Sequence, residues 1–134
     1  MDVTDGTLCQ LRGRKTVVLF PAHCWRESLY PFPASTTGMS WAFSQVVQSQ
    51  PDLEKFPKLR EGLEHKMEVH LEEGEVLYIP ACCAHEISGE ADLSDGSPAD
   101  HVLSMNRFWR TDPDLVRKHL PADALADFNR TLAM

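Results

Sequence analysis

Two adjacent cysteines and a histidine close the segment GEVLYIPACCAH, which runs from Gly74 to His85. Cysteine and histidine side chains can ligate a metal, or they can act together as a nucleophile and its base. The histidine could equally be an ordinary polar residue beside a strand. Each of these three roles requires different neighbours, so the rest of the sequence has to distinguish among them.

The cysteines of the chain favour packing over chemistry. There are four of them: Cys9, Cys24, Cys82 and Cys83. They form no Cys-x-x-Cys pair and no disulfide framework, which argues against a structural zinc site. We interpret Cys82 and Cys83 as small packing residues. A Cys/His hydrolase that uses either of them with His85 is a weak alternative, because residues so close on a strand cannot easily face one another.

Length and composition indicate one globular domain with an acidic surface. The chain has 134 residues, of which 43% are hydrophobic and 25% are charged, and this suits a single soluble domain. The formal net charge is −7, so overall charge gives nucleic-acid binding no support, although a local basic patch stays compatible with it. Without a signal core or a long apolar stretch, we expect a cytoplasmic or nuclear protein that does not contact a membrane.

Six segments have the composition of short antiparallel strands. They are Thr7–Leu11, Thr16–Phe20, Lys66–Leu71, Val76–Pro80, residues 85–89 and His101–Trp109. Apolar residues alternate with polar ones in several of them, and the second is rich in β-branched residues. A glycine-containing turn separates the first two segments, which predicts that they form a hairpin.

Irregular and helical segments complete the expected architecture. Residues 21–41 carry three prolines and predict irregular surface chain of a length that is usually functional. Gln50–Leu59 predicts a short helical turn closed by Pro57. In the tail, Asp112 and Pro113 mark the start of a helix. Several short strands followed by helices predict a small barrel or sandwich.

His85 is the histidine best placed for chemistry. It follows a strand that ends in proline, where a barrel strand would deliver its side chain to the barrel mouth. We expect solvated side chains at four others, which lie in predicted loops or at alternating polar positions: His23, His65, His70 and His101.

The residues around His85 resemble a known family. GEVLYIPACCAH is similar to the pattern G-[DE]-V-L-[YF]-I-P-x-x-[WY]-x-H of the cupin-like JmjC family of iron(II)- and 2-oxoglutarate-dependent oxygenases. Three further blocks follow the family in order. DVTDGTLCQLRGRKTVVLFP resembles its HxD…N…Q-x-x-G-x-K-x-x-x-L-F-x-P strand pair; LYPFP, SQV and PDLEKFPKL resemble its connecting segment; LSMNRFWR resembles its closing S-V-N-x-F-W strand. Within the family, the similarity is greatest to hydroxylases of a tRNA base and of protein asparagine.

The resemblance implies roles for five residues. Asp2 matches the metal-binding carboxylate of His-x-Asp, and His85 matches the distal metal-binding histidine. Lys15 matches the lysine that pairs with the far carboxylate of 2-oxoglutarate, and Asn106 matches an asparagine that lines the site near this cosubstrate. Trp109 falls where the family has an aromatic residue near the substrate groove.

The chemistry of the family explains these residue types. Two histidines and one carboxylate hold Fe(II) while leaving coordination positions open for the cosubstrate and O₂. A fixed cation compensates the second carboxylate of 2-oxoglutarate in a partly buried pocket. The implied reaction couples decarboxylation of 2-oxoglutarate to hydroxylation of a C–H bond.

The sequence departs from the family pattern at three places. The first histidine ligand of the family lies two residues before the aspartate, a position that would precede Met1 here. Gly6 stands where relatives carry an asparagine, and CCA (Cys82–Ala84) replaces a segment that usually contains a bulky aromatic residue. These departures favour a rival interpretation, a non-catalytic cupin-like binding module that has lost iron.

We therefore expect a mainly β, double-stranded β-helix (a cupin or jelly-roll-like barrel) over residues 1–110, N-terminally incomplete, with a C-terminal helical segment over 111–134. The expected function is that of an Fe(II)- and 2-oxoglutarate-dependent oxygenase that hydroxylates a macromolecule, either a tRNA base or a protein side chain. We also expect a homodimer through the C-terminal helices, because apolar residues at helical spacing there have little chain left to cover them.

Overall fold

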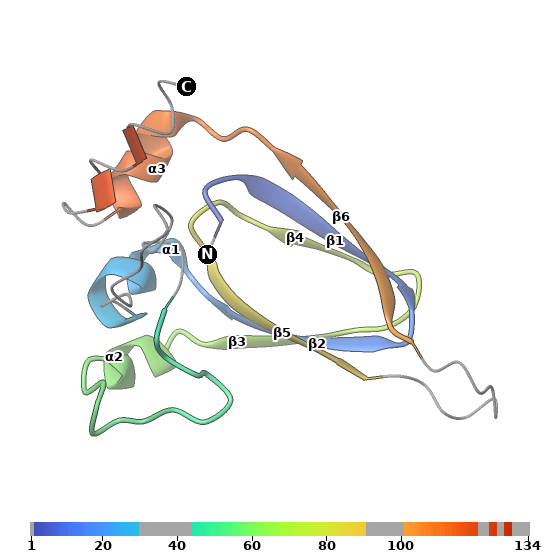
Figure 1. Cartoon of the computed structure of the whole chain (residues 1–134), viewed down its shortest axis with the longest axis horizontal. Coiled ribbons are helices and arrows are strands. Elements are labelled where there is room, and N and C mark those ends of the chain that lie inside the picture. Colours follow the sequence, from blue (N-terminus) through green and yellow to red (C-terminus); the bar gives the residue numbers. More distant parts are fainter. Residues whose placement is uncertain (1, 30–43, 91–100, 121–123, 126–127, 130–134) are drawn as a thin grey trace.

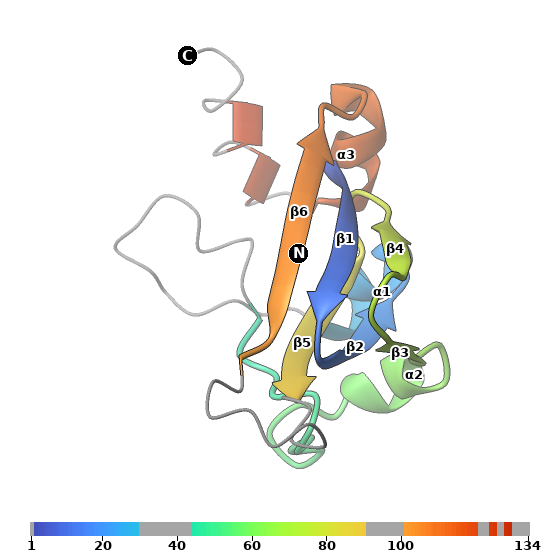
Figure 2. The same cartoon turned by 90° about the vertical axis from the view of Figure 1, so that its right-hand side faces the viewer.

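In the part of the chain that the structure describes, six strands form two antiparallel sheets. The computed structural model describes residues 2–29, 44–90, 101–120, 124–125 and 128–129. One sheet has the order β4-β1-β6, with strands Val76–Ile79, Asp5–Arg12 and Leu103–Trp109. The other has the order β3-β2-β5, with strands Met67–Leu71, Arg14–Phe20 and Ala84–Glu90. Figure 1 shows the sheets as two facing layers, and Figure 2 shows β1 between β4 and β6. All six predicted strands are confirmed.

The predicted hairpin between the first two strands is wrong, because β1 and β2 belong to opposite sheets. The chain crosses between the sheets at Gly13, whose φ is 71°. A Cβ at this position would lie 2.9 Å from the carbonyl oxygen of Glu90, so only glycine fits without a shift. The fully buried side chain of Gln10 donates through Nε2 to the carbonyls of Arg12 at 2.6 Å and Gly13 at 3.0 Å. These bonds hold the crossing in place.

Strand register sets three rungs of side chains across the interior between the sheets. Residues opposite one another in antiparallel strands share a face. Together with the burial of Leu8 and Val17, this identifies the inward positions. The first rung holds Leu19 and His85 with Gly6 and Phe108; the second holds Val17 and Ile87 with Leu8 and Asn106; the third holds Lys15 and Gly89 with Gln10 and Ser104. The pairs are matched across the interior by the hollow that Gly6, Phe108 and His85 line together and by the hydrogen bond from Lys15 to Ser104. We call these the inner rungs.

An apolar cluster joins the two sheets along the inner rungs. Leu8 from β1 packs with Val17 and Leu19 from β2 and with Leu71 from β3. All four side chains are buried, and fully burying a side chain of this size contributes about 1.5–3 kcal/mol. This cluster holds the sheets together beside the polar residues of the same rungs.

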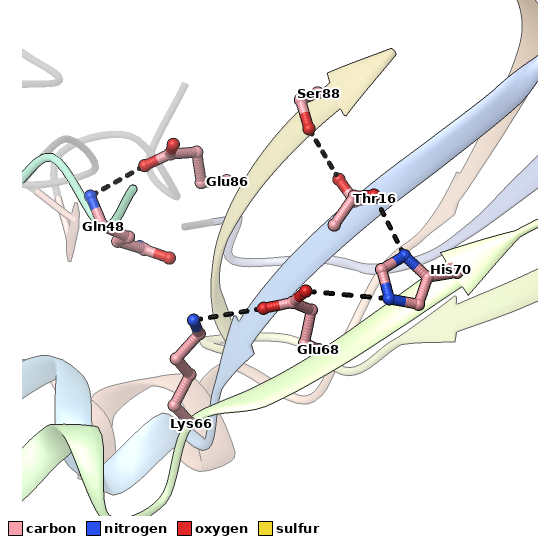
Figure 3. Close-up of polar contacts among 7 residues, drawn as sticks. All are labelled: Thr16, Gln48, Lys66, Glu68, His70, Glu86 and Ser88. Atoms are coloured by element: carbon pink, nitrogen blue, oxygen red, sulfur yellow. Dashed lines mark hydrogen bonds and ion pairs between the residues drawn. The ribbon is translucent and has the colours of Figure 1, made fainter. Parts of the chain in front are cut away.

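The outer faces of the two sheets differ in character. On the β3-β2-β5 sheet, Glu68 lies 3.1 Å from the Lys66 ammonium and 3.6 Å from His70, and His70 contacts the Thr16 hydroxyl at 3.1 Å (Figure 3). The outer face of the β4-β1-β6 sheet instead exposes large apolar side chains: Val76, Tyr78, Leu103, Met105 and Trp109. The outer face of the β3-β2-β5 sheet therefore carries polar groups that suit water, whereas the outer face of the β4-β1-β6 sheet exposes apolar side chains to water.

The segment after β2 is helical where an irregular chain was predicted. Helix α1 (Ala22–Cys24) continues into a π-helical turn, η1 (Trp25–Leu29), and residues 30–43 lie outside the described part. The prediction is corrected because this turn carries buried apolar residues, Cys24, Trp25 and Leu29, which pack against Phe20 and Leu59. The free energy gained by burying these apolar side chains on one side of a helix outweighs the tendency of small residues and prolines to form irregular chain.

The predicted helical turn within Gln50–Leu59 is confirmed, because the backbone N–H of Phe56 donates to the carbonyl of Asp52 at 2.9 Å and so closes one helical turn directly before Pro57. The described chain forms isolated turns there, in which the Asp52 carboxylate accepts a backbone N–H from Lys55 at 2.9 Å. Helix α2 (Leu59–Leu63) begins after Pro57. Pro57 has no backbone N–H with which to continue the turn that ends at Phe56, and it lies one residue before Lys58, the N-cap of α2.

Helix α3 (Pro113–His119) begins where predicted, with the Asp112 side chain accepting the backbone N–H of Asp114 at 2.9 Å. Its apolar residues Val116 and Leu120 pack against Ala81 and Cys82, together with Ala124 and Phe128. The chain therefore covers these residues itself, whereas Leu115 of the same helix is exposed; the dimer stays a prediction. No helix in the described ranges is long and apolar enough to cross a membrane.

Replacing Gly13 should destabilise the protein more than replacing another glycine of similar backbone conformation. Gly13→Ala places a methyl group 2.9 Å from a backbone oxygen, whereas Gly74→Ala at φ 87° meets nothing within 4 Å. Both variants bear the cost of a positive φ, about 1–2 kcal/mol, and only Gly13→Ala adds the clash. Urea unfolding should rank wild type above Gly74→Ala and Gly74→Ala above Gly13→Ala; equal losses would contradict the steric account of the crossing.

Candidate metal and cosubstrate site

His85 is the second residue of β5 and follows a buried turn. Cys82 in this turn has φ 65° and donates its backbone N–H to the carbonyl of Asp2 at 2.7 Å. Both Cys82 and Cys83 are buried, as predicted. Burial raises the pKa of the Cys82 thiol to about 11 and raises the pKa of Cys83 as well. The thiols are protonated at neutral pH, which argues against the Cys/His hydrolase.

The ring of His85 is oriented so that one nitrogen faces a carboxylate. Its Nδ1 lies 3.1 Å from the carbonyl oxygen of Cys83, and a carbonyl can only accept, so Nδ1 carries the proton. Burial lowers the pKa of His85, while the Cys83 carbonyl and Asp2 act in the opposite direction. In the neutral ring, the lone pair of Nε2 lies 3.6 Å from Oδ2 of Asp2. Two lone-pair donors face one another across a gap that suits a cation.

A hollow of about 320 Å³, which includes some open solvent, lies at this end of the interior. Asp2, Thr4, His85 and Asn106 contribute polar groups to its lining, and the other lining residues include Leu8, Ile79, Ile87 and Phe108. Of the five residues to which the family resemblance assigns roles, the structure thus brings three together at the hollow: Asp2, His85 and Asn106. A small set of polar groups converging in a mostly apolar hollow is typical of a ligand site.

Lys15 lies at the opposite end of the same interior. It occupies the third inner rung, beside Gly89 of β5, whereas His85 occupies the first. Four residues of strand separate these rungs, which corresponds to about 13 Å. The Lys15 ammonium donates to the hydroxyl of Ser104 on β6, so this side chain crosses from one sheet to the other. Lys15 is therefore an inward residue and not a solvated hairpin residue.

The structure does not bring Trp109 to the hollow. Trp109 is opposite Asp5 on the outer face of its sheet, and the Arg107 guanidinium lies 5.7 Å from its ring centre. The aromatic residue of the hollow is Phe108, which shares the inner face with Asn106. Counting two residues from Asn106 along the strand would have selected Phe108, because side chains on one face recur every second residue.

Gly6 allows Phe108 to occupy the mouth of the hollow. A Cβ at Gly6 would lie 3.0 Å from Cδ1 of the Phe108 ring, so the ring would have to move by a few tenths of an ångström to make room for it. The family asparagine at this position would have to displace the ring. The departure at Gly6 therefore replaces a polar group near the hollow with an aromatic surface.

Asp5 anchors the mouth and was not predicted from the sequence. Its Oδ1 accepts from the Tyr78 hydroxyl at 2.6 Å and from the Ala81 backbone N–H at 3.1 Å, and its Oδ2 accepts from the Thr111 hydroxyl. These bonds tie the start of β1 to the ends of β4 and β6. The hydrogen bond from Thr111, followed by that from Tyr78, lowers the pKa of Asp5. No local pattern marks such a residue, because its partners are 73 to 106 positions away.

Comparison with known proteins places the chain in a family. A cupin-like domain profile matches residues 1–115. The chain belongs to the cupin-like domain family. This match confirms the predicted double-stranded β-helix, with which the two antiparallel sheets agree, and it supports the cupin-like JmjC resemblance.

Named relatives of this cupin-like domain include two tRNA wybutosine-synthesizing proteins and a demethylase. The chain is 32% identical over 123 residues to tRNA wybutosine-synthesizing protein 5 of Gallus gallus, covering 91% of this chain and 30% of that protein. The Homo sapiens protein of the same name gives the same values. Lysine-specific demethylase JMJ31 of Arabidopsis thaliana is 32% identical over 110 residues, covering 82% of this chain and 18% of the demethylase. The chain thus spans less than a third of these relatives.

Replacing Asp5 should weaken the protein in a pH-dependent manner. A folded-state pKa below the ordinary value of 3.8 means that the Asp5 carboxylate stabilises the fold above that pH, and that this contribution is lost as the pH falls through the folded pKa. Asp5→Asn should therefore cost about 1 kcal/mol at neutral pH, reduced by solvent exposure. The difference from wild type should shrink below about pH 4.

Urea unfolding at pH 7 and pH 3 measures this effect. Asp114→Asn is the control, because its ion pair with Arg117 is exposed and such pairs contribute little. An Asp5→Asn loss that is the same at both pH values would contradict the proposed role of the carboxylate charge.

Proposed function

We propose that this chain is part of an Fe(II)- and 2-oxoglutarate-dependent oxygenase. In this proposal Asp2 and His85 are metal ligands, and Lys15 and Asn106 bind the cosubstrate. Its support is the family membership together with one observation, the lone-pair gap between Asp2 and His85. The corresponding activity of a longer protein is part of the same proposal, since the chain covers only 30% of its wybutosine-synthesizing relatives.

The gap between Asp2 and His85 has the dimensions of a metal site. Carboxylate oxygens and imidazole nitrogens bind divalent transition metals at about 2.0–2.2 Å, so a separation of 3.6 Å between Oδ2 and Nε2 accommodates one ion in contact with both. The Cys83 carbonyl fixes the ring through Nδ1, an outer contact of the kind that orients metal-binding histidines. The donor types fit iron, which accepts carboxylate and imidazole ligands.

Asp2 and His85 are two of the three ligands that a site with two histidines and one carboxylate requires. Among the described residues, no group of three or more histidine, cysteine, aspartate or glutamate side chains is placed to hold a metal. Fe(II), with 2-oxoglutarate and O₂, would supply the oxidising chemistry that hydroxylates a C–H bond. The contribution of the chain is to hold the ion through Asp2 and His85 and to surround it with the apolar walls of the hollow.

Lys15 and Asn106 suit a cosubstrate that carries two carboxylates. Asn106 lines the hollow with Asp2 and His85, where an amide can hydrogen-bond to an anion beside the metal. Lys15, two inner rungs away, provides a positive charge for a second carboxylate. A dicarboxylate such as 2-oxoglutarate matches an interior with a metal site at one end and a cation at the other.

The proposed substrate is a macromolecule, either a tRNA base or a protein side chain. The names of the wybutosine-synthesizing relatives support the tRNA, and the name of the demethylase supports the protein. A net charge of −7 gives this chain no general attraction for phosphates. If tRNA is the substrate, phosphate contacts would depend on a local patch or on other parts of a longer protein.

Metal binding should depend on His85 and should tighten when a third donor is added. The chain supplies two donors, so we expect weak binding of Mn(II), a stable substitute for Fe(II). A histidine placed directly before Met1 creates the family spacing His-x-Asp. It should increase affinity at least tenfold, because even outer-shell groups change metal affinity by about 10- to 100-fold. Calorimetric titration measures the affinity.

Two variants of the extended chain complete this experiment. His85→Ala should abolish the gain, whereas His70→Ala should leave it unchanged, because His70 lies on the outer face with Glu68 and Thr16. Tight Mn(II) binding that survives His85→Ala would remove His85 from the metal site. The absence of any gain from the added histidine would favour the metal-free module.

Lys15→Met should weaken 2-oxoglutarate binding and leave Mn(II) binding unchanged. Loss of a charge-assisted contact of about 1.5–3 kcal/mol corresponds to a roughly ten- to hundredfold decrease in affinity. The measurement is titration of 2-oxoglutarate into the Mn(II)-loaded extended chain. Lys66→Met is the matched control, since the Lys66 ammonium is paired with Glu68 on the outer face. Equal cosubstrate affinity in both variants would exclude Lys15 from the site.

The second candidate function is a cupin-like binding module without iron. The observation that favours it is the packing of Phe108 against Gly6, which gives the mouth of the hollow an aromatic surface where the family has a polar one. This module would bind its ligand without a metal, so its affinity for 2-oxoglutarate would not respond to Mn(II).

A further inference from the structure

The Lys15 ammonium is held by a neutral group. It donates to the hydroxyl of Ser104, and both side chains are partly buried. Within the described ranges no carboxylate forms an ion pair with Lys15. Lys66 offers a contrast, because Glu68 neutralises its charge at 3.1 Å. The Ser104 hydroxyl fixes the position of the Lys15 ammonium but leaves its positive charge uncompensated.

This hydrogen bond joins the two sheets at the third inner rung. Lys15 extends from β2, and Ser104 extends from β6, where it is opposite Gln10. The two residues are 89 positions apart in the chain, so the local chain does not hold them together. The position of the Lys15 ammonium within the interior is therefore set by the position of the Ser104 hydroxyl on β6.

The surroundings of this rung offer few other polar contacts. Gly89, the neighbour of Lys15 on β5, has no side chain, and a Cβ built on it would lie 3.3 Å from the methyl groups of Val102. The Gln10 side-chain amide donates to the backbone at the crossing. Both hydrogen bonds of Gln10 use Nε2, and its buried Oε1 has no hydrogen-bond partner. The hydrogen bond that holds the Lys15 ammonium is therefore the one to Ser104, and loss of that hydroxyl would release the ammonium from its position.

We propose that Ser104 is a positioning residue for Lys15: it holds the ammonium at the third inner rung, where the ammonium receives the far carboxylate of the dicarboxylate cosubstrate. The identity of that anion rests on the proposed function. The positioning itself does not, because it follows from the hydrogen bond between the two sheets and from the absence of a described ion pair at Lys15.

Lysine labelling of the full chain tests the positioning without any cosubstrate. Acetylation by an N-hydroxysuccinimide ester is followed at each lysine by mass spectrometry, and the readout is the Lys15 rate divided by the Lys66 rate. Ser104→Ala should raise this ratio about fivefold, which corresponds to one hydrogen bond of about 1 kcal/mol. Ser104→Thr keeps the hydroxyl and should retain the wild-type ratio. Both variants should keep the circular dichroism spectrum of the wild type, so that a raised ratio reports the lost hydroxyl and not a general loss of structure.

Ser88→Ala is the matched control, because the Ser88 hydroxyl donates to the Thr16 carbonyl on the opposite face of β2 (Figure 3). It should not change the ratio. A Ser104→Ala ratio equal to wild type would overturn the proposal, and so would a ratio that rises equally in Ser104→Ala and Ser104→Thr.

Protection by 2-oxoglutarate links the result to the proposed function. In the Mn(II)-loaded extended chain, 2-oxoglutarate should slow Lys15 acetylation, and Ser104→Ala should require roughly tenfold more of it for half-protection. If Ser104→Ala raises the Lys15 ratio but 2-oxoglutarate protects no variant, Ser104 still positions Lys15 and the oxygenase proposal fails. If 2-oxoglutarate protects wild type and Ser104→Ala at equal concentrations, the oxygenase proposal stands and the role of Ser104 in cosubstrate binding is overturned.

Discussion

The crossing between the two sheets at Gly13 is the constraint on which the rest of the structure depends. Gly13 supplies a backbone conformation and a close approach that a side chain would block, and the buried amide of Gln10 holds the carbonyls on either side of the turn. Because the chain changes sheets here, β1 and β2 face one another across an interior. A hairpin at the same place would have put β1 and β2 in one sheet, and Lys15 would not face Ser104, whose strand pairs with β1, across an interior.

The crossing also gives the interior two chemically different ends. At one end, Asp2 and His85 present lone pairs toward the same point, and at the other, Lys15 presents a positive charge held by a hydroxyl. The apolar cluster of Leu8, Val17 and Leu19 lies between them and joins the sheets. An elongated anion with a metal-binding group at one end is complementary to this arrangement of charge. The membership of the chain in the cupin-like domain family is consistent with it.

The sequence predicted the features that depend on neighbouring residues and missed those that depend on distant ones. Alternation and β-branched residues located all six strands, and Asp112 with Pro113 located the start of α3. Sheet membership is set by pairing with strands far along the chain, so the hairpin prediction failed. The role of Asp5 was missed for the same reason, because two of its partners are Tyr78 and Thr111.

The candidate site was predicted through resemblance more than through physical pattern. Alone, neither Asp2 near a terminus nor Lys15 beside a glycine turn is distinguishable from a solvated residue. Their joint spacing with His85 and Asn106 selected them. Trp109 was selected in the same way, but the two-residue period of the strand turns it to the outer face and turns Phe108 to the inner one.

The pairing of the first strand with the last one determines the order in which the protein can mature during synthesis. The β3-β2-β5 sheet has all its strands once Glu90 has been made. The other sheet has to wait for β6, and the bond from Asp5 to Thr111 closes a loop of 106 positions, the kind of long-range contact that forms slowly. Asp2 and Lys15 therefore leave the ribosome well before Ser104 and Asn106. Between these two points of synthesis, the nascent chain carries Asp2 and Lys15 without the strand that holds Ser104 and Asn106. Because unpaired strands of this kind promote aggregation, the arrival of β6 both brings Asn106 to the hollow and covers the edge that β1 exposes until then.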